Sequence, residues 1–530
     1  MGRRTRVLLC ASGTSFIIML DSNIVAVSLP SIAHELKAAF AEIEWILSAY
    51  IVTFAALLMP AGALADRFGR RRLLAIGLLL FTLSSLLCGL APTPLILNSA
   101  RALQGVGAAF QLSAALAVLG HEFRGVERAK AFGSWGSVVG VAVAVGPPIG
   151  GIITSYFGWR WAFLVNVPIG FVLIGLLLTA VEESSDPDAR KLDVIGMVCF
   201  GAALFCLVWA LIDIHSHEAS NRPALIRLGI GAALLLLFVG AELVQTRPMI
   251  DFDLLRGRTF LGSAVAMLGF AGTAQVMMTY LPLYFQNASG FTPASAGLAM
   301  LPFAVPLFLC PRIGAALALH VSGRALLTLG LVLVAAGNLA TAAAVSCDFS
   351  FPFVAIAIFM TGCGAGLLAA ETAKVSISVV PPERGGMASG VAATLRFIGL
   401  IIGVVGLGAI LSIATEDYLL DARLTFIAPE LAGERFQSTV SRIVAGDAEA
   451  VVSQLPKATQ ATVLDMLHQS FVHGFTDVLL VATALAALAA ATTYWLVSAA
   501  ETAPIDPPAA TKPKGRVTPE IALLSDEIKP

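Results

Sequence analysis

Residues 62–72, which read Gly-Ala-Leu-Ala-Asp-Arg-Phe-Gly-Arg-Arg-Arg, form a short polar link between two apolar runs near 44–64 and 73–91. A membrane-spanning helix needs roughly 20 apolar residues, and each flanking run has about that length. The link carries four arginines and one acid, and its glycines permit two helix ends to approach closely. The stretch therefore predicts two membrane helices joined by a tight, basic turn.

The apolar character of these two runs extends over nearly the whole chain. Of 530 residues, 58% are hydrophobic and 13% are charged, and the mean hydropathy is +0.87. Soluble domains carry about 25% charged residues, so these values exclude a soluble globular protein, a disordered chain and a disulfide framework. We count fourteen runs of spanning length, near 7–29, 44–64, 73–91, 95–119, 131–154, 161–181, 192–213, 226–244, 260–285, 293–318, 325–345, 351–371, 388–412 and 474–498. The expected fold class is an all-α polytopic membrane protein.

Basic residues alternate between the loops in a way that predicts the topology. If the N-terminus is cytoplasmic, the even-numbered short loops hold fifteen Lys and Arg residues and the odd-numbered ones hold three. The fifteen are Arg67, Arg70, Arg71, Arg72, Arg124, Arg128, Lys130, Arg190, Lys191, Arg247, Arg256, Arg258, Arg324, Lys374 and Arg384, and the three are Lys37, Arg160 and Arg222. Because Lys and Arg accumulate in cytoplasmic loops, both termini are expected in the cytoplasm.

A faint internal repeat runs through the chain. A shift of 254 residues places Gly323-Arg324 on Gly69-Arg70 and His320 on Asp66, and Gly105-Val106-Gly107 finds a counterpart in Gly364-Ala365-Gly366. Membrane transporters are often built from such repeats. We therefore expect helices one to six to repeat as nine to fourteen, with seven and eight inserted between them.

This repeat divides the chain into four parts. The prediction is an N-terminal six-helix bundle over 1–184, two inserted linker helices over 185–247, and a C-terminal six-helix bundle over 248–500. Within the last bundle, an extracytoplasmic loop over 413–473 is expected to form short amphipathic helices. Residues 501–530 are expected to be a disordered cytoplasmic tail.

Two opposite charges interrupt the first and fourth runs at similar depth. Asp21 lies roughly 12 Å from the outer end of its helix and Arg101 roughly 9 Å from the outer end of its own, at 1.5 Å per residue. A charge inside a span is costly and is a functional candidate. The hypothesis is that both face one cavity, and that Arg101 tunes the proton affinity of Asp21. The alternative is that Arg101 extends to the membrane surface and Asp21 hydrogen-bonds a neighbour.

Two further motifs point to conformational change. In the link after the second run, Asp66 can accept hydrogen bonds from a neighbouring helix and pair with Arg70, which would latch one packing of the two halves. The alternative is an ordinary solvated loop. The residues of this candidate latch are Gly62, Asp66, Arg67, Gly69 and Arg70. The fifth run carries small residues and a kink that serve close packing or motion. They are Gly136, Gly140, Gly146, Pro147, Gly150 and Gly151.

The candidates for a substrate cavity are polar or aromatic residues inside the runs, namely Gln104, Gln275, Tyr280, Tyr284 and Arg396. Tyr280 and Tyr284 are four residues apart and share a helix face, where aromatic rings could hold a flat cation. The alternative is an aromatic belt at the membrane surface. We expect no metal and no catalytic residues, because the seven cysteines lack metal-ligand spacing. With a net charge of -1, no nucleic-acid partner is expected either.

Taken together, these motifs resemble the major facilitator superfamily, in particular its fourteen-helix drug:proton antiporter branch. Further stretches typical of that branch are Trp159 to Phe163, Asn166 to Gly170, Leu192-Asp193 with Gly196, Tyr280 to Gln286, and Arg384-Gly385 with Arg396 and Gly399. The resemblance implies two six-helix bundles that rock around a central cavity. It implies proton coupling at Asp21 and Arg101, a latch at Asp66, and an antiporter motif in the fifth helix.

The expected function is proton-coupled export of hydrophobic, often cationic, small molecules by alternating access. The expected partners are the lipid bilayer and the substrates and, in a cell with two membranes, a periplasmic adaptor protein docked on 413–473. No cofactor is expected, because the proton gradient drives the cycle. Three alternatives stay open: a dedicated exporter of one metabolite, siderophore or antibiotic, a polytopic membrane enzyme, and a transporter-like sensor.

Overall fold

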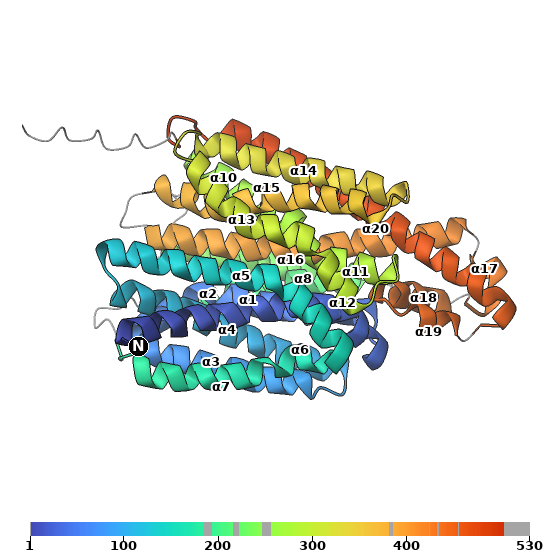
Figure 1. The fold of residues 1–530 in the computed structure, drawn as a ribbon, viewed down its shortest axis with the longest axis horizontal. Coiled ribbons are helices and arrows are strands. Elements are labelled where there is room, and N and C mark those ends of the chain that lie inside the picture. The colour runs from blue at the N-terminus through green and yellow to red at the C-terminus, as the bar shows by residue number, and fades with distance from the viewer. Residues whose placement is uncertain are drawn as a thin grey trace, which may run out of the picture.

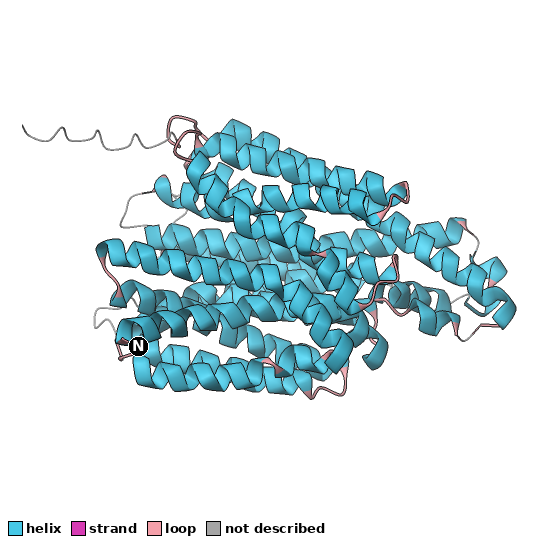
Figure 2. Ribbon diagram, in the orientation of Figure 1, coloured by secondary structure: helices cyan, strands magenta, loops and turns pink. Residues whose placement is uncertain are grey.

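The computed structural model describes residues 2–184, 193–215, 222–245, 256–380, 385–422, 424–431, 434–453 and 455–502. Every described element is a helix (Figure 2). Most of the predicted tail, from residue 503 on, lies outside the described residues, and so do the loop residues Arg190, Lys191, Arg247 and Arg384.

The prediction of fourteen spanning helices is confirmed within the described part of the chain. The first six spans are α1 (Arg3–Leu36), α2 (Phe40–Phe68), α3 (Arg70–Gly89), α4 (Pro94–Glu122), α5 (Gly125–Phe157), and α6 (Arg160–Leu164) with α7 (Asn166–Ala180). Two more are α8 (Val194–His215) and α9 (Arg222–Val244). The last six are α10 (Arg258–Phe270) with the π-helical turn η2 (Ala271–Gln275) and α11 (Met277–Asn287), α12 (Pro293–Ala299) with α13 (Leu301–Leu317), α14 (Gly323–Ser346), α15 (Phe351–Ser378), α16 (Gly385–Asp421) and α20 (Lys457–Leu496).

The spans run side by side along the long axis of the molecule (Figure 1). We call the end that holds Arg3 and Thr502 the terminal end. The opposite end, which carries the small helices α17 (Leu424–Ile427), α18 (Glu434–Ala445) and α19 (Ala448–Val452), is the loop end. Each span begins at the end where the previous one stops, so Asp21 and Arg101 approach each other from antiparallel helices.

Glycine determines how closely the helices of the first bundle pack. A Cβ on Gly107 of α4 would lie 2.7 Å from the backbone nitrogen of Phe81 and 3.0 Å from the Gly77 carbonyl, both on α3. A Cβ on Gly105 would lie 2.3 Å from the Tyr50 carbonyl of α2. Because no Cβ fits at these points, α4 can lie directly against the backbones of both neighbours.

The second bundle repeats these contacts, but the register differs from the predicted one. A Cβ on Gly364 of α15 would lie 2.5 Å from the Gly330 carbonyl of α14, and one on Gly362 would lie 2.4 Å from the Phe303 carbonyl of α13. By their contacts, Gly362 and Gly364 are therefore the counterparts of Gly105 and Gly107. The predicted pairing with Gly364 and Gly366 was displaced by two residues, because glycines recur at every second position from 362 to 366.

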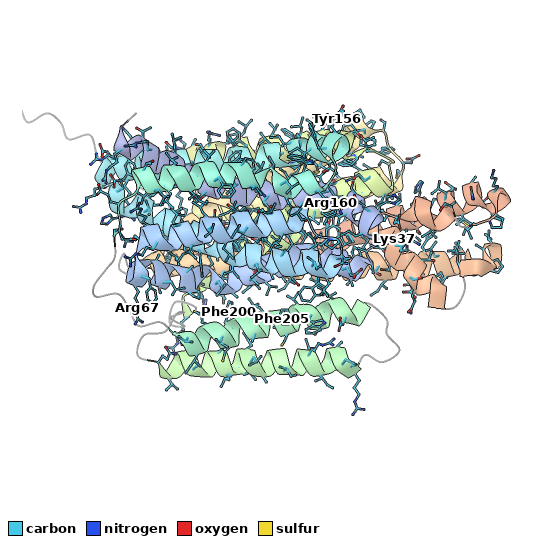
Figure 3. All side chains as sticks on the ribbon, turned by 90° about the horizontal axis from the view of Figure 1, so that it is seen from below. Lys37, Arg67, Tyr156, Arg160, Phe200 and Phe205 are labelled. Carbon is cyan, nitrogen blue, oxygen red and sulfur yellow. The ribbon has the colours of Figure 1, made fainter. Side chains whose placement is uncertain are left out.

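Helices α8 and α9 form a hairpin that lies beside the two bundles (Figure 3). α8 packs against α2 of the first bundle and α16 of the second. On the α2 side, the ring of Phe205 lies 5.6 Å from the ring of Trp45. The inserted pair thus covers the line along which α2 meets α16.

The predicted loop 413–473 is largely helical, because its two flanking spans extend into it. α16 continues to Asp421 and α20 already begins at Lys457. The short amphipathic helices expected between them are present as α17, α18 and α19. α18 packs on α1 and α2 as well as on α16, and the backbone nitrogen of Phe40 donates to Ser441 Oγ at 2.8 Å.

Substitution of Gly107 tests this packing. Gly107→Val should lower the stability of the purified protein by about 1–3 kcal/mol, because overpacking forces α3 and α4 apart. Thermal unfolding in detergent, followed by tryptophan fluorescence, measures the change. Gly136→Val is the matched control, since nothing lies within 4 Å of a Cβ at that position. Equal stability of the two variants would contradict the packing argument.

Candidate functional site

Asp21 and Arg101 meet in the interior of the first bundle. Arg101 Nη1 donates to Asp21 Oδ2 at 2.7 Å, and both side chains are fully buried. The expectation that the two charges lie at the same level is therefore confirmed, although α1 continues to Leu36, so Asp21 lies farther from the end of its helix than the sequence predicted. The alternative in which Arg101 extends to the membrane surface is wrong.

Each member of the pair has further partners that suit its charged form. Asp21 Oδ1 accepts hydrogen bonds from Gln104 Nε2 at 2.9 Å and from Asn166 Nδ2 at 2.8 Å. Arg101 Nε donates to the Ile46 carbonyl at 2.9 Å, and its guanidinium lies 4.2 Å from the centre of the Tyr50 ring. The site thus holds an ionised carboxylate against a cation with three donors in place, as a buried anion requires.

The pair points into the core of the bundle, and this corrects the expectation that both residues face a cavity. Asn166 belongs to α7, and Gln104 also donates to Ser85 Oγ of α3 at 2.8 Å. Side chains from α1, α3, α4 and α7 therefore enclose Asp21. Gln104, a candidate for the substrate cavity, is fully buried in the same cluster.

The candidate latch lies at the terminal end between α2 and α3. Arg70 donates to Asp66 Oδ1 from Nε at 3.0 Å and from Nη2 at 2.7 Å, which confirms the predicted pairing. Gly69 has a φ of +106°, a conformation that favours glycine. Gly62 differs from the expected close contact, since nothing lies within 4 Å of a Cβ there. Arg67 is exposed at this end of the molecule (Figure 3).

Sequence reasoning missed Glu183, which binds the start of α3. Its carboxylate accepts from the backbone nitrogens of Arg71 at 3.1 Å and Arg72 at 3.2 Å. An acid at a helix N-terminus satisfies free N–H groups and interacts favourably with the helix dipole. The sequence offered one signal for this contact: Glu183 is an acid directly after the sixth apolar run, and it could pair with a basic loop. In this conformer the polar contacts described above for the loop lie within the first bundle, so its role as a latch between halves stays a prediction.

The small residues of α5 act at the loop end. A Cβ on Gly146 would lie 2.5 Å from Asn23 Cβ, and one on Gly150 would lie 2.7 Å from Ile24 Cα, both on α1. A Cβ on Gly151 would lie 2.2 Å from the Pro293 carbonyl of α12. In turn, a Cβ on Gly297 of α12 would lie 2.3 Å from the Pro147 carbonyl of α5. This half of the motif brings α5 against both bundles.

The other half of the α5 motif is more open. Gly136 has nothing within 4 Å of a Cβ, and at Gly140 the nearest atom is Phe308 Cδ2 at 3.0 Å. The motif therefore changes from close backbone contacts at the loop end to a side-chain contact at Gly140 and open space at Gly136 toward the terminal end.

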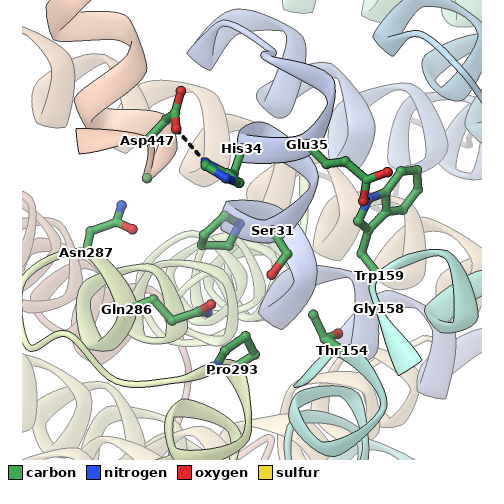
Figure 4. Close-up of a pocket in the computed structure, with 12 residues that line it drawn as sticks. Ser31, His34, Glu35, Thr154, Gly158, Trp159, Gln286, Asn287, Pro293 and Asp447 are labelled. Atoms are coloured by element: carbon green, nitrogen blue, oxygen red, sulfur yellow. Dashed lines mark hydrogen bonds and ion pairs between the residues drawn. The ribbon is translucent and has the colours of Figure 1, made fainter. Parts of the chain in front are cut away.

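Several hydrogen bonds between the two bundles lie at the loop end, and one, from Arg312 Nη2 of α13 to Ser137 Oγ of α5 at 3.5 Å, lies nearer the terminal end. Gln286 Nε2 of α11 donates to the Val27 carbonyl of α1 at 3.0 Å, and the backbone nitrogen of Ala294 donates to Ser155 Oγ at 2.9 Å. His34 Nδ1 lies 2.7 Å from Asp447 Oδ1 (Figure 4). These contacts surround a cavity of about 450 Å³ at the loop end. The structure is therefore held closed at this end.

The remaining cavity candidates lie on the second bundle, and none of them lines that pocket. Arg396 Nε donates to Gln275 Oε1 at 2.7 Å, which supplies the partner that the sequence did not name. Tyr280 is buried and its hydroxyl donates to the Val404 carbonyl. Tyr284 stacks on Phe475 of α20, with ring centres 4.7 Å apart. The two tyrosines are buried within the protein rather than forming a belt at its surface.

Asp193, in the predicted Leu-Asp-x-x-Gly motif, lies just before α8. Burial raises the pKa of this carboxyl, but hydrogen bonds from Gln245 Nε2 and the Gly196 backbone nitrogen outweigh burial and hold the pKa below its usual value. Asp193 therefore stays ionised at neutral pH and joins the ends of α8 and α9.

The family follows from this arrangement together with the comparison of sequences. The model of the family described as Major Facilitator Superfamily matches residues 11–404. The chain belongs to the Major Facilitator Superfamily. It is therefore a multi-pass protein of the plasma membrane. Among the described residues, no group of three or more His, Cys, Asp or Glu side chains could hold a metal ion.

Similar members of this superfamily have names that concern drug resistance and export. Multidrug resistance protein Stp of Mycobacterium tuberculosis is 33% identical over 422 residues, which cover 78% of this chain and 77% of Stp. The tetracenomycin C resistance and export protein of Streptomyces glaucescens is 28% identical over 494 residues, 92% of this chain and 91% of that protein.

A solved structure of a bacterial homologue of the lysosomal transporter Spinster, in an inward-facing and occupied conformation, has the same fold. It superposes with a TM-score of 0.64 at 16% identity, over 95% of this chain and 99% of the other.

The buried pair generates a double-mutant prediction. Asp21→Asn should cost about 3–5 kcal/mol of stability, because it leaves Arg101 buried without an anion. Adding Arg101→Gln should restore most of this loss, since two neutral side chains then share the site. Thermal unfolding of the three variants in lipid nanodiscs measures both effects. A double variant that is less stable than Asp21→Asn would show that the pair is not a coupled unit.

Proposed function

We propose that this chain is a proton-coupled antiporter that exports hydrophobic, often cationic, small molecules by alternating access. The observation that carries the proposal is the fully buried pair of Asp21 and Arg101 in the first bundle. An acid that meets one cation and two amide donors can exchange its charge state only if a proton enters or leaves a dry site. The names of Stp and of the tetracenomycin C exporter support export as the direction.

The cycle uses this pair as the proton site. In the conformer closed at the loop end, Asp21 is ionised and Arg101 neutralises it. A proton that reaches Asp21 releases Arg101 from the pair, which weakens the contacts that join α1 to α4. Substrate and proton then alternate because each one favours a different charge state of the first bundle. The cytoplasm lies at the terminal end in this proposal, as the distribution of basic loop residues predicts.

A second candidate is a dedicated exporter of one antibiotic or metabolite. One similar protein has a name that mentions a single compound, tetracenomycin C, and this similarity favours the second candidate. Both candidates need the same proton site, and they differ in how many compounds move. We propose a non-enzymatic transporter in either case, driven by the proton gradient without a cofactor. The helices that project at the loop end are the surface proposed for an adaptor protein in a cell with two membranes (Figure 1).

Proton release in inside-out vesicles tests the proposal. We expect several lipophilic cations and neutral drugs to dissipate a preformed proton gradient, read with a pH-sensitive dye, when the wild-type chain is present. Asp21→Asn should reduce this response to the level of empty vesicles, because it cannot exchange a proton. Glu371→Gln is the matched control, since Glu371 is also buried but pairs with Lys374 near the terminal end of the second bundle.

The pattern of responses separates the candidates. Responses to many unrelated compounds support multidrug export, whereas a response to a single compound supports the dedicated exporter. A full response in Asp21→Asn would remove Asp21 from the coupling mechanism. No response to any compound, including extracts of the organism's own secreted metabolites, would contradict transport by proton exchange.

A further inference from the structure

A second acid lies between the two bundles, and the sequence interpretation did not use it. Glu44 is one turn inside α2 from the loop end, and only 4% of its surface is exposed. Its Oε1 atom has no hydrogen-bond partner. It therefore differs from Asp21, which meets three donors at its two oxygens.

Residues of the second bundle form the pocket that holds this carboxyl group. A Cβ on Gly408 of α16 would lie 2.1 Å from Glu44 Oε1 and 2.8 Å from the hydroxyl oxygen of Tyr280 on α11. Glycine at position 408 is thus required for the acid to enter, and Tyr280 forms another wall. Glu44 reaches from the first bundle into the second, so the pocket exists only while α2, α11 and α16 are together.

The charges on the elements packed around α2 either pair with other residues or, as Lys37 at the end of α1 does, lie exposed. Arg101 of α4 pairs with Asp21 of α1, and Arg442 of α18 pairs with Asp447, which also contacts His34 of α1. On α16, Arg396 lies three turns away and binds Gln275. None of the ion pairs formed within the described part of the chain involves Glu44. A carboxylate anion buried without a partner is strongly unfavourable, whereas the protonated acid is tolerated.

The two acids are therefore suited to opposite charge states in the same conformer. Asp21 is surrounded as an anion should be, and Glu44 is surrounded as a neutral acid should be. Closing the loop end buries Glu44, and opening it returns the carboxyl group to water, where the anion is stable. Proton binding at Glu44 must then be linked to closure of the loop end.

We propose that Glu44 is a second proton-binding site, located in the seam between the bundles, and that the loop end closes only when Glu44 carries a proton. This second site would add to the proposed function. It rests on that function in one respect, which is that the two bundles must separate at the loop end. For an antiporter, such a site has a direct use. An open carrier that has released its substrate outside cannot close again until a proton from that side has bound.

Hydrogen exchange of the full-length protein in nanodiscs, without substrate, tests this link. Protection of peptides that cover 40–50 and 404–412 is measured over a range of pH and corrected for the intrinsic exchange rate. In the pH range where Glu44 is ionised in the open state and protonated in the closed state, each opening event releases one proton. We therefore expect protection of the wild-type seam to fall about tenfold per pH unit over that range. Glu44→Gln, which resembles the protonated acid, should stay protected at all pH values.

Three variants control the experiment. Glu371→Gln removes a buried glutamate outside the seam and should keep the wild-type pH dependence. His34→Asn removes a different titratable contact at the loop end, that of His34 with Asp447, and should also keep the wild-type pH dependence. Gly408→Ala should lose protection even at low pH, because the new methyl group excludes the Glu44 carboxyl group. If Glu44→Gln does not fold, the protection measured in Gly408→Ala is used as the test instead.

The outcomes separate this proposal from the proposed function. Exchange is measured without substrate, so a chain that moves no drug but shows the expected seam titration would support the proton site alone. Wild-type protection that does not change with pH, or a dependence that persists in Glu44→Gln, would overturn the role of Glu44. If Gly408→Ala keeps the protection of the wild-type seam, this result would also overturn the role of Glu44. A dependence lost in His34→Asn but kept in Glu44→Gln would assign the switch to His34 instead.

Discussion

Two opposite charges in a dry helix bundle are stable only in contact with each other, and Asp21 and Arg101 meet this condition in the first bundle. The pair determines more than one contact. Arg101 also holds the Ile46 carbonyl of α2, and Gln104 links Asp21 to Ser85 of α3. A rotation of any of these helices by one residue would break the cluster. The charge pair therefore sets the register in which the helices of the first bundle pack.

Close contacts at glycines fix how near the helix backbones lie to one another, as the polar cluster fixes the register of the side chains. Lipid offers no hydrophobic driving force between helices, so association depends on close packing. Gly105 and Gly107 of α4 and their counterparts Gly362 and Gly364 of α15 supply it in each bundle. Between the bundles, Gly151 and Gly408 admit a carbonyl and a carboxyl group of the opposite half. The contacts within each bundle are independent of the contacts between bundles, so the halves can part without unfolding.

The sequence predicted the number of spans and the shared level of the two charges, because the length of the apolar runs and the rise per residue determine both. It did not predict the direction of each side chain around its helix. Asp21 and Gln104 were expected at a cavity and lie in the bundle core. Glu44 was overlooked for a related reason. An acid at the first position of an apolar run is normally a surface residue, and only the approach of α11 and α16 buries it.

The inserted hairpin of α8 and α9 makes the two sides of the carrier unequal. It covers the line between α2 and α16, where Phe205 packs on Trp45. On the opposite side, the described residues place no further helix over the seam where α5 faces α13. There Arg312 of α13 donates to Ser137 of α5 at 3.5 Å, and Gly133 and Gly136 have open space at their Cβ positions. A compound dissolved in the bilayer therefore meets an apolar wall along the line between α2 and α16. The insertion therefore makes the molecule asymmetric about the axis between its two bundles, because the hairpin lies along only one of the described seams.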